Sequence, residues 1–348
     1  MNPSSNNRLF PIYVRKGRSP RTSHAGYIDR TGSIVVAPKY EFAYPFRGGL
    51  GTVSLNLSWG AIDVEGELAV PLMSGRALEF TEGLSRFTQN TRAGVIDKEG
   101  NIVVPPRYKS ISHYNGGLAC VAMGELYGYI DRQGRQVITA FFEDARAFSE
   151  GLAAVKLGGK WGYIHPDGSS AIATRFDCGR SVAGPFRYGL ARVADNGKWG
   201  YIKKDGEFVI SAQFDMALEF SEGLGMIELG KRRGYIDTSG KIVVPPSFRW
   251  AHAFSEGLAS VDTGTGEAHR TIAEACESGF INPSGEFVIP PRFLSTGRFQ
   301  DGICLVETEK NIGYIDQTGN FIWRDKWVQT GGFDPFHLLP PEKTPNSD

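Results

Sequence analysis

The stretch FSEGLAAVKLGGKWGYIHPDG, residues 148–168, decides the fold because its landmarks recur along the chain. In each copy a glycine precedes an aromatic or aliphatic residue and isoleucine, and successive glycines stand 34 residues apart in six of the eight intervals. These glycines are Gly26, Gly60, Gly94, Gly128, Gly162, Gly200, Gly234, Gly279 and Gly313. The aromatic residue of FSEGL keeps the same period at Phe46, Phe80, Tyr114, Phe148, Phe186, Phe220, Phe254 and Phe299. A fixed period of this length is the signature of a repeat architecture, so we predict nine units.

A tight turn is predicted in every unit where a glycine stands three residues after an aspartate, as in Asp29 and Gly32. The aspartate side chain can accept a hydrogen bond from a backbone N–H two residues on, and glycine adopts the left-handed conformation that closes a turn. Calcium binding at these aspartates is the weaker interpretation, since no unit supplies the cluster of oxygen ligands that calcium prefers. The positions that we assign to the repeat framework are Trp59, Trp161, Trp199, Gly162, Gly200, Asp29, Asp131 and Asp237.

Each unit is predicted to contain three short antiparallel strands, of the kind GLAAVKL, KWGYI and Ile102-Val103-Val104. Prolines such as Pro105 and Pro106 follow the third strand and should end its pairing, because proline lacks an amide donor. A small residue, such as Ala153, follows the first aliphatic residue of strand one. We expect the aromatic residue of strand two to lie over this small residue.

These units predict an all-β chain, and we favour an open, curved solenoid over a closed β-propeller. Propellers typically have four to eight blades, which nine units exceed, and no unit looks divided between the two ends of the chain. The expected organisation is a flexible N-terminus at residues 1–7, the repeat array at 8–325, and a C-terminal cap with a disordered tail at 326–348.

The composition argues against several classes of function. Lysine plus arginine equals aspartate plus glutamate, 38 against 38, so the basic excess typical of nucleic-acid binders is missing. The sequence contains no run of eighteen apolar residues that would span a membrane, and we recognise no leader in it. We therefore expect a cytoplasmic protein. The four cysteines form no CxxC pair, and we predict neither a metal nor a cofactor.

Around Trp161-Gly162-Tyr163-Ile164 and Trp199-Gly200-Tyr201-Ile202 the chain resembles the bacterial WG-repeat (KWG-repeat) family. The resemblance covers roughly residues 8 to 325, although Trp is replaced in most units. It implies a β-rich repeat module used for binding, without a shared enzymatic activity. A role as the antidote, or immunity protein, of a bacterial toxin is a special case that this family would allow.

The longest departure from the period lies between Phe254 and Gly279, where eleven extra residues fall within DTGTGEAHRTIAEACES. Insertions in repeat proteins often lie on the binding face. We therefore predict that a partner protein contacts Glu267, His269, Arg270 and Glu274. A catalytic pair of His269 and Cys276 is the weaker interpretation, because no third residue is marked to orient it.

The recurrent aromatic residues allow a second function. A ladder of exposed aromatic faces could bind sugars, but rings that recur once per unit are better explained as the core between units. We therefore expect a non-enzymatic scaffold that binds another protein, with a glycan-binding module as the alternative.

Overall fold

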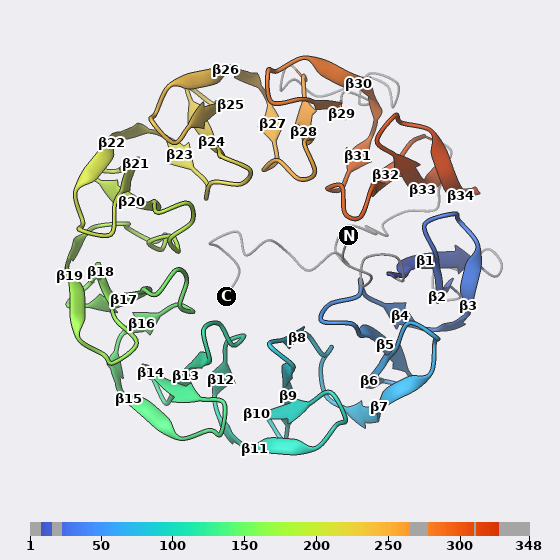
Figure 1. The fold of residues 1–348 in the computed structure, drawn as a ribbon, viewed down its shortest axis with the longest axis horizontal. Coiled ribbons are helices and arrows are strands. Elements are labelled where there is room, and N and C mark those ends of the chain that lie inside the picture. Colours follow the sequence, from blue (N-terminus) through green and yellow to red (C-terminus); the bar gives the residue numbers. More distant parts are fainter. Residues whose placement is uncertain (1–7, 16–22, 265–277, 310, 327–348) are drawn as a thin grey trace, which may run out of the picture. The chain divides into compact units, whose positions relative to one another are not determined.

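The structure is a computed structural model that describes residues 8–15, 23–264, 278–309 and 311–326. All regular elements in these ranges are strands, β1 to β34 (Figure 1). No helix of this described part is long and apolar enough to cross a membrane.

The strands form nine antiparallel sheets in chain order. The first five sheets are β1(Phe10–Arg15) β2(Ser23–Ile28) β3(Ile34–Tyr40); β4(Phe42–Ala43) β5(Gly51–Leu55) β6(Ser58–Ile62) β7(Leu68–Ser74); β8(Phe80–Thr81) β9(Leu84–Gln89) β10(Arg92–Asp97) β11(Ile102–Tyr108); β12(Ser110–Ile111) β13(Leu118–Met123) β14(Leu126–Asp131) β15(Gln136–Phe142); and β16(Asp144–Ala145) β17(Ala153–Leu157) β18(Lys160–Ile164) β19(Ser170–Phe176). The other four are β20(Ala191–Asp195) β21(Lys198–Ile202) β22(Phe208–Phe214); β23(Met216–Ala217) β24(Leu224–Leu229) β25(Arg232–Asp237) β26(Ile242–Phe248); β27(Trp250–Ala251) β28(Ala259–Asp262) β29(Ser278–Ile281) β30(Phe287–Phe293); and β31(Ser295–Thr296) β32(Ile303–Glu307) β33(Asn311–Asp316) β34(Phe321–Lys326).

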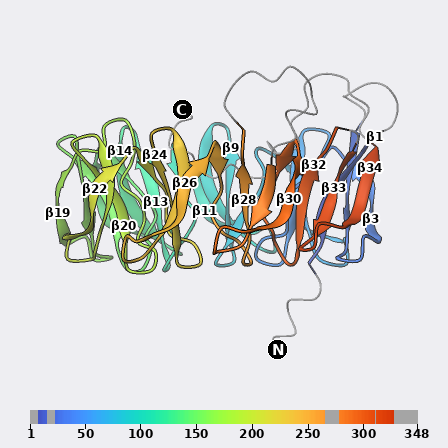
Figure 2. The ribbon, with the colours of Figure 1, turned by 90° about the horizontal axis from the view of Figure 1, so that it is seen from above.

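The chain divides into two compact units, and their boundary, between Thr174 and Arg175, falls within β19. We call them the first and the second unit and describe each by itself. Within each unit the strands of successive sheets stand side by side and run between the same two faces (Figure 2).

Most sheets are composite, which corrects the predicted unit of three strands. The segment after a third strand is not irregular throughout, because it begins with a two-residue strand that pairs with the next repeat. In β4, for example, Phe42 pairs with Ser54 and Ala43 pairs with Val53 of β5. Six repeats donate the first strand of the following sheet in this way, and four-stranded sheets result.

The prediction of an open solenoid was wrong, and the fold is that of a nine-blade β-propeller. In the described residues each sheet ends after three or four strands, and no ladder joins one sheet to the next. Within each unit the short leading strands, such as β12 and β31, lie on one side and the long third strands, such as β15 and β30, on the other (Figure 1). The sheets therefore fan out as blades. Undivided units at the two ends do not exclude a propeller, because most repeats in the described residues contribute a strand to the following sheet.

The prolines of the third strand do not end it, contrary to the prediction. Strand β11 continues through Pro105 and Pro106, with Val104 paired to Val95 and Tyr108 paired to Ala93. The residues between Val104 and Tyr108 form a bulge, and the backbone of this bulge lies against the glycine of strand two. An ideal Cβ on Gly94 would lie 2.6 Å from the carbonyl oxygen of Val104. The bulge thus explains why this repeat position is glycine.

Neighbouring blades pack through the tyrosine of strand two and the aromatic residue of FSEGL in the next blade. The Tyr129 ring is fully buried, with its centroid 4.9 Å from that of Phe148. Its hydroxyl donates a hydrogen bond of 2.8 Å to the carbonyl of Arg146, so the buried polar group is satisfied. The same bond joins Tyr235 to His252 at 2.6 Å.

The small residue of strand one lies against the FSEGL aromatic of its own blade, not chiefly against strand two as predicted. An ideal Cβ on Gly51 would meet the Phe46 ring at 2.4 Å. At Gly225 the nearest atoms belong to Phe220, at 3.0 Å, and the Tyr201 hydroxyl follows at 3.1 Å. Small residues are therefore required where this ring crosses strand one.

The Ser and Glu of FSEGL bind the next blade. In the second unit the Glu222 carboxylate accepts hydrogen bonds from the N–H groups of Glu256 and Gly257, at 2.6 and 2.9 Å. The Ser221 hydroxyl donates to the carbonyl of Phe254 at 2.8 Å. These contacts explain why polar residues recur within an otherwise apolar motif.

We predict that Gly128→Ala lowers the free energy of unfolding by about 3 kcal/mol, because the new methyl group would collide with the backbone of the third strand. Its Cβ would lie 2.5 Å from the carbonyl oxygen of Ile138. Gly124→Ala is the control, since Gly124 has φ +69° and no neighbour within 4 Å. The control should cost only the left-handed strain of about 1 kcal/mol. Urea denaturation compares the two, and equal losses would contradict the steric explanation.

Candidate functional site

The predicted partner contacts Glu267, His269, Arg270 and Glu274 lie outside the described residues, as does Cys276. The framework positions lie in turns and in the core. Asp131 Oδ1 accepts hydrogen bonds from the N–H groups of Gln133 and Arg135, at 3.0 and 2.9 Å. Asp29 and Asp237 make the same two bonds within their own turns.

The recurrent aromatic residues are mostly buried. Trp161 is 1% exposed and Trp199 is 9% exposed, and the strand-two tyrosines are likewise buried. Trp59 is half-buried and stacks on Phe42, with ring centroids 5.9 Å apart. These rings serve the core and do not form an exposed ladder, whereas other aromatic side chains, such as Tyr188 and Trp250, are exposed.

Two third strands, β7 and the last one, β34, do not end in the aromatic residue that ends the others, and β7 is the one within the first unit. The strands β3, β11, β15, β19, β22, β26 and β30 end in a buried aromatic residue, whereas β7 ends in Ser74. The terminal aromatic normally pairs with the residue before the strand-two glycine, as Tyr108 does with Ala93. In β7 this pairing falls one residue early, because Met73 pairs with Trp59 and Ser74 pairs with Ser58. The bulge of β7 therefore absorbs one residue fewer than the others.

The shifted register removes the strand that should lead into the next sheet. In six repeats the residue after the aromatic donates its N–H to strand one of the following sheet, as Glu41 does to the Ser54 carbonyl at 2.9 Å. In the described structure no ladder joins residues 75–78 to β9, and pairing begins only at Phe80 with Ser85. Gly75, with φ +142°, passes so close that its ideal Cβ would lie 2.7 Å from the Thr88 carbonyl oxygen.

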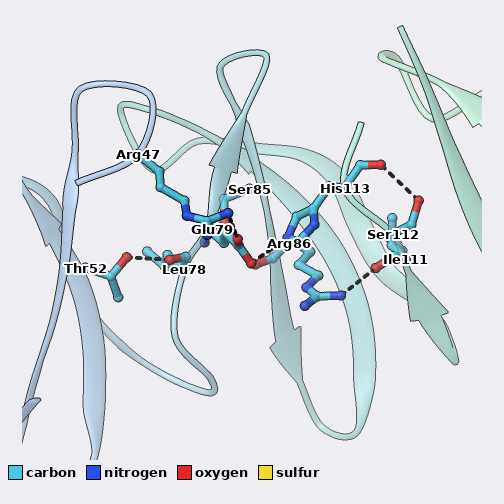
Figure 3. Close-up of polar contacts among 9 residues, drawn as sticks. All are labelled: Arg47, Thr52, Leu78, Glu79, Ser85, Arg86, Ile111, Ser112 and His113. Atoms are coloured by element: carbon cyan, nitrogen blue, oxygen red, sulfur yellow. Dashed lines mark hydrogen bonds and ion pairs between the residues drawn. The ribbon is translucent and has the colours of Figure 1, made fainter. Parts of the chain in front are cut away.

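Side chains hold the displaced segment in place of the missing ladder (Figure 3). The Thr52 hydroxyl donates to the carbonyl of Leu78. The N–H of Glu79 donates to Ser85 Oγ at 2.8 Å. The Glu79 carboxylate lies 2.5 Å from Arg47 Nη1 and 2.7 Å from His113 Nε2. The connection thus has a defined path away from β9.

A pocket of about 1030 Å³ lies in the space between this segment, β9 and the neighbouring blades of the first unit. Its apolar part includes four buried side chains, Leu50, Leu78, Phe80 and Ile111. Its charged lining consists of Arg47, Arg76, Arg86, Lys109 and Glu79. Four cations and one anion therefore line a pocket in a chain whose lysines and arginines balance its acids, 38 against 38.

Glu79 is the one acidic lining residue, and its neighbours keep it ionised. Burial raises the pKa of this carboxyl, but contact with His113 and the charges of Arg47 and Arg86 outweigh burial and hold its pKa below the ordinary value. Arg86 also donates from Nη1 to the carbonyl of Ile111 at 3.2 Å. A single carboxylate engaged in this way is suited to positioning arginines, and the lining as a whole favours an anionic ligand.

The described residues contain no group of three or more His, Cys, Asp or Glu placed to hold a metal ion. The lining residues of the pocket likewise contain no histidine or cysteine. Their chemistry is that of hydrogen bonding, charge and apolar contact.

Sequence reasoning missed this pocket although a signal was present. The spacing of the repeat does not reveal the pocket, because both landmarks remain 34 residues apart here. The informative difference is the residue type at Met73 and Ser74, where related units carry pairs such as Arg107 and Tyr108. A shift of register changes no length, so a spacing criterion cannot detect it.

We predict that Met73→Arg combined with Ser74→Tyr restores the register of the other repeats and closes the pocket. A buried ring and renewed ladder bonds should raise the free energy of unfolding by about 1 to 3 kcal/mol. Hydrogen exchange should show slower exchange of the Thr88 amide. Unchanged exchange at Thr88 would contradict our account of how the pocket forms.

We predict that Glu79→Gln lowers the free energy of unfolding at pH 7 by about 1 to 2 kcal/mol, because Arg47 loses a partly buried charged partner. The pKa of Glu79 is lower in the folded protein than its ordinary 4.5, so its stabilisation is present above that value and is lost as the pH falls. The difference between wild type and variant should therefore shrink below about pH 4.5, as followed by urea denaturation. Glu125→Gln, at a carboxylate that is 89% exposed, is the control and should have little effect. A difference that persists at pH 3 would count against this role of the Glu79 charge.

Comparison with solved structures gives a likeness of fold. The structure titled "Crystal structure of the eukaryotic initiation factor" aligns with TM-score 0.63 at 13% identity, covering 91% of this chain and 96% of that one. BamB from Moraxella catarrhalis aligns with TM-score 0.44 at 8% identity, covering 76% and 99%. Apo AztD from Citrobacter koseri aligns with TM-score 0.44 at 13% identity, covering 92% and 95%. Only the first likeness is strong enough to use, and at this identity it concerns the fold alone.

A search of curated proteins finds no match to the sequence. The family model described as WG containing repeat does match, and the resemblance seen in the sequence is thereby confirmed. It matches residues 26–56, 59–90, 94–127, 127–161, 161–199, 199–232, 234–264 and 279–311. The chain therefore belongs to the family of proteins with WG containing repeats.

Proposed function

We propose that this protein is a non-catalytic scaffold that binds another protein, and that the pocket of the first unit is a point of contact. The observation that carries the proposal is a pocket at the place where six other sheets have a leading strand and β9 has none at residues 75–78. Since a regular repeat would be better paired here, this departure favours a function over a purely structural role.

The character of the pocket supports binding in place of turnover. Its volume of about 1030 Å³ is at the upper end of ordinary ligand sites, and a protein segment can use such a space. Its one carboxylate is held by Arg47 and His113, and no second acid lies among the lining residues. General acid and base catalysis usually requires a group poised near neutral pH, which Glu79 is not.

A glycan-binding module has less support than a protein-binding scaffold. The aromatic residues that suggested it, Trp161 and Trp199, are buried between blades. An antidote role in a toxin system is a special case of protein binding and stays a prediction. Contacts from Glu267, His269, Arg270 and Glu274 likewise stay a prediction.

Site-specific photo-crosslinking tests the proposal. Benzoylphenylalanine at Gln89, an exposed residue of the pocket, should capture a specific protein in an extract of the source cells. Leu157 occupies the same repeat position in β17 and is 43% exposed, so it is the matched control. The captured protein is then purified and its affinity for the unmodified chain is measured.

The proposal expects an adduct at Gln89 that is missing at Leu157 and in the variant with Met73→Arg and Ser74→Tyr. The purified partner should bind wild type at least tenfold more tightly than this closed variant. Equal capture at the two positions, or equal affinity for the two chains, would show that the pocket is not the contact.

A further inference from the structure

We infer that the pocket accepts an extended, acidic segment of the partner, which adds to the open edge of β9 as an antiparallel strand. This inference rests on the proposed function and specifies how the partner is recognised. Its basis is the juxtaposition of an unpaired strand edge, a cationic rim and an apolar floor within one pocket.

The open edge is defined by comparison with the six sheets that have a leading strand. In β5 the carbonyl of Ser54 accepts from Glu41, and the carbonyl of Thr52 accepts from Tyr44, each at 2.9 Å. Thr88 and Arg86 occupy the same two positions in β9.

In the described structure no main-chain hydrogen bond from residues 75–78 reaches either Thr88 or Arg86. On the other side β9 is complete, with Thr88 paired to Ala93 of β10. Arg86 and Thr88 therefore have no strand partner on this edge, although Gly75 lies against the Thr88 carbonyl and Ser85 Oγ donates to the Arg86 carbonyl at 3.2 Å. An unpaired edge is a template for an added strand, which here would displace Gly75 from Thr88.

The charges around this edge indicate an acidic occupant. Arg76 and Arg86 are both exposed and line the pocket, while Arg47 is fixed at the rim by Glu79. Lys109 is paired with Glu125, but that pair is exposed and exchanges readily with another carboxylate. Charge complementarity of this kind directs encounter and fixes register more than it adds affinity.

The floor and size of the pocket suit a short strand. The buried side chains of Leu50, Leu78, Phe80 and Ile111 give an apolar surface for alternate residues of the added segment. A strand of six residues is about 20 Å long and offers three side chains to each face. Its main chain would supply affinity and its side chains specificity.

A peptide taken from this chain provides the probe. Ac-AFFEDA has the sequence of residues 140–145, and its last two residues form the leading strand β16 of their own sheet, where Asp144 pairs with Lys156. Ac-AFFQNA has the same shape without the carboxylates. Fluorescence anisotropy measures the affinity of labelled peptides, and hydrogen exchange locates the bound strand.

The inference expects Ac-AFFEDA to bind at least tenfold more tightly than Ac-AFFQNA, and to slow amide exchange in residues 84–91. Arg86→Gln should remove most of this preference, whereas Arg135→Gln should not. Arg135 is 77% exposed and pairs with Asp131 in its own turn, so it is the matched control.

Thr88→Pro tests the main-chain contact separately, because it removes an N–H on the open edge. The variant should lose binding of both peptides while its far-ultraviolet circular dichroism stays unchanged. If Thr88→Pro misfolds, Arg86→Gln still tests whether charge contributes to binding. Hydrogen exchange in the wild-type protein then tests whether the peptide adds to the edge of β9.

Two results would overturn the inference. One is equal binding of both peptides with no protection of residues 84–91. The other is failure of either peptide to bind while the Gln89 adduct persists, which would leave the proposed function standing and reject only this mode of recognition. Loss of the Gln89 adduct as well would reject the proposed function itself.

Discussion

The transfer of a two-residue strand from most repeats to the next sheet is the constraint on which the fold depends. A 34-residue repeat has too few apolar side chains to form a stable sheet alone, and composite sheets make each repeat complete its neighbour. The Tyr129 hydroxyl and the Phe148 ring then fix one blade against the next. Where the strand is not transferred, at residues 75–78, the blade remains standing because Thr52, Ser85 and Arg47 hold the connection by their side chains. Side-chain contacts thus replace the missing ladder hydrogen bonds and preserve the fold, and the same replacement opens the pocket.

The sequence was sufficient to predict the parts of the fold that depend on local chemistry. The period, the turns at Asp131 and similar positions, and the strand class follow from backbone preferences that act within a few residues. The arrangement of blades was not predictable in the same way, because the strand at Phe42 and Ala43 is too short to carry a pattern of its own. Its role depends on pairing with β5 of the following repeat. Two residues without periodicity look like a loop when considered alone.

The candidate site was harder to predict than the fold, for a related reason. Met73 is an acceptable residue for a strand, and nothing local shows that it pairs one position early. Only the set of equivalent residues, with Tyr108 and Phe142 at the position of Ser74, reveals the missing ring. The register is decided by how many residues the bulge of β7 absorbs, which is a property of two strands together. In a repeat protein the comparison of equivalent residues is therefore as informative about function as an insertion is.

An open strand edge is normally a liability, since it invites pairing with any other edge. The position of β9 limits this risk, because Gly75 lies over the edge at Thr88 and the blades on either side supply Leu50 and Ile111. Any strand that adds at Thr88 must therefore displace Gly75 first. Arg76 and Arg86 add a further restriction, since they repel cationic segments and favour acidic ones. The features that protect the protein from unspecific association are thus the features that would select a particular partner.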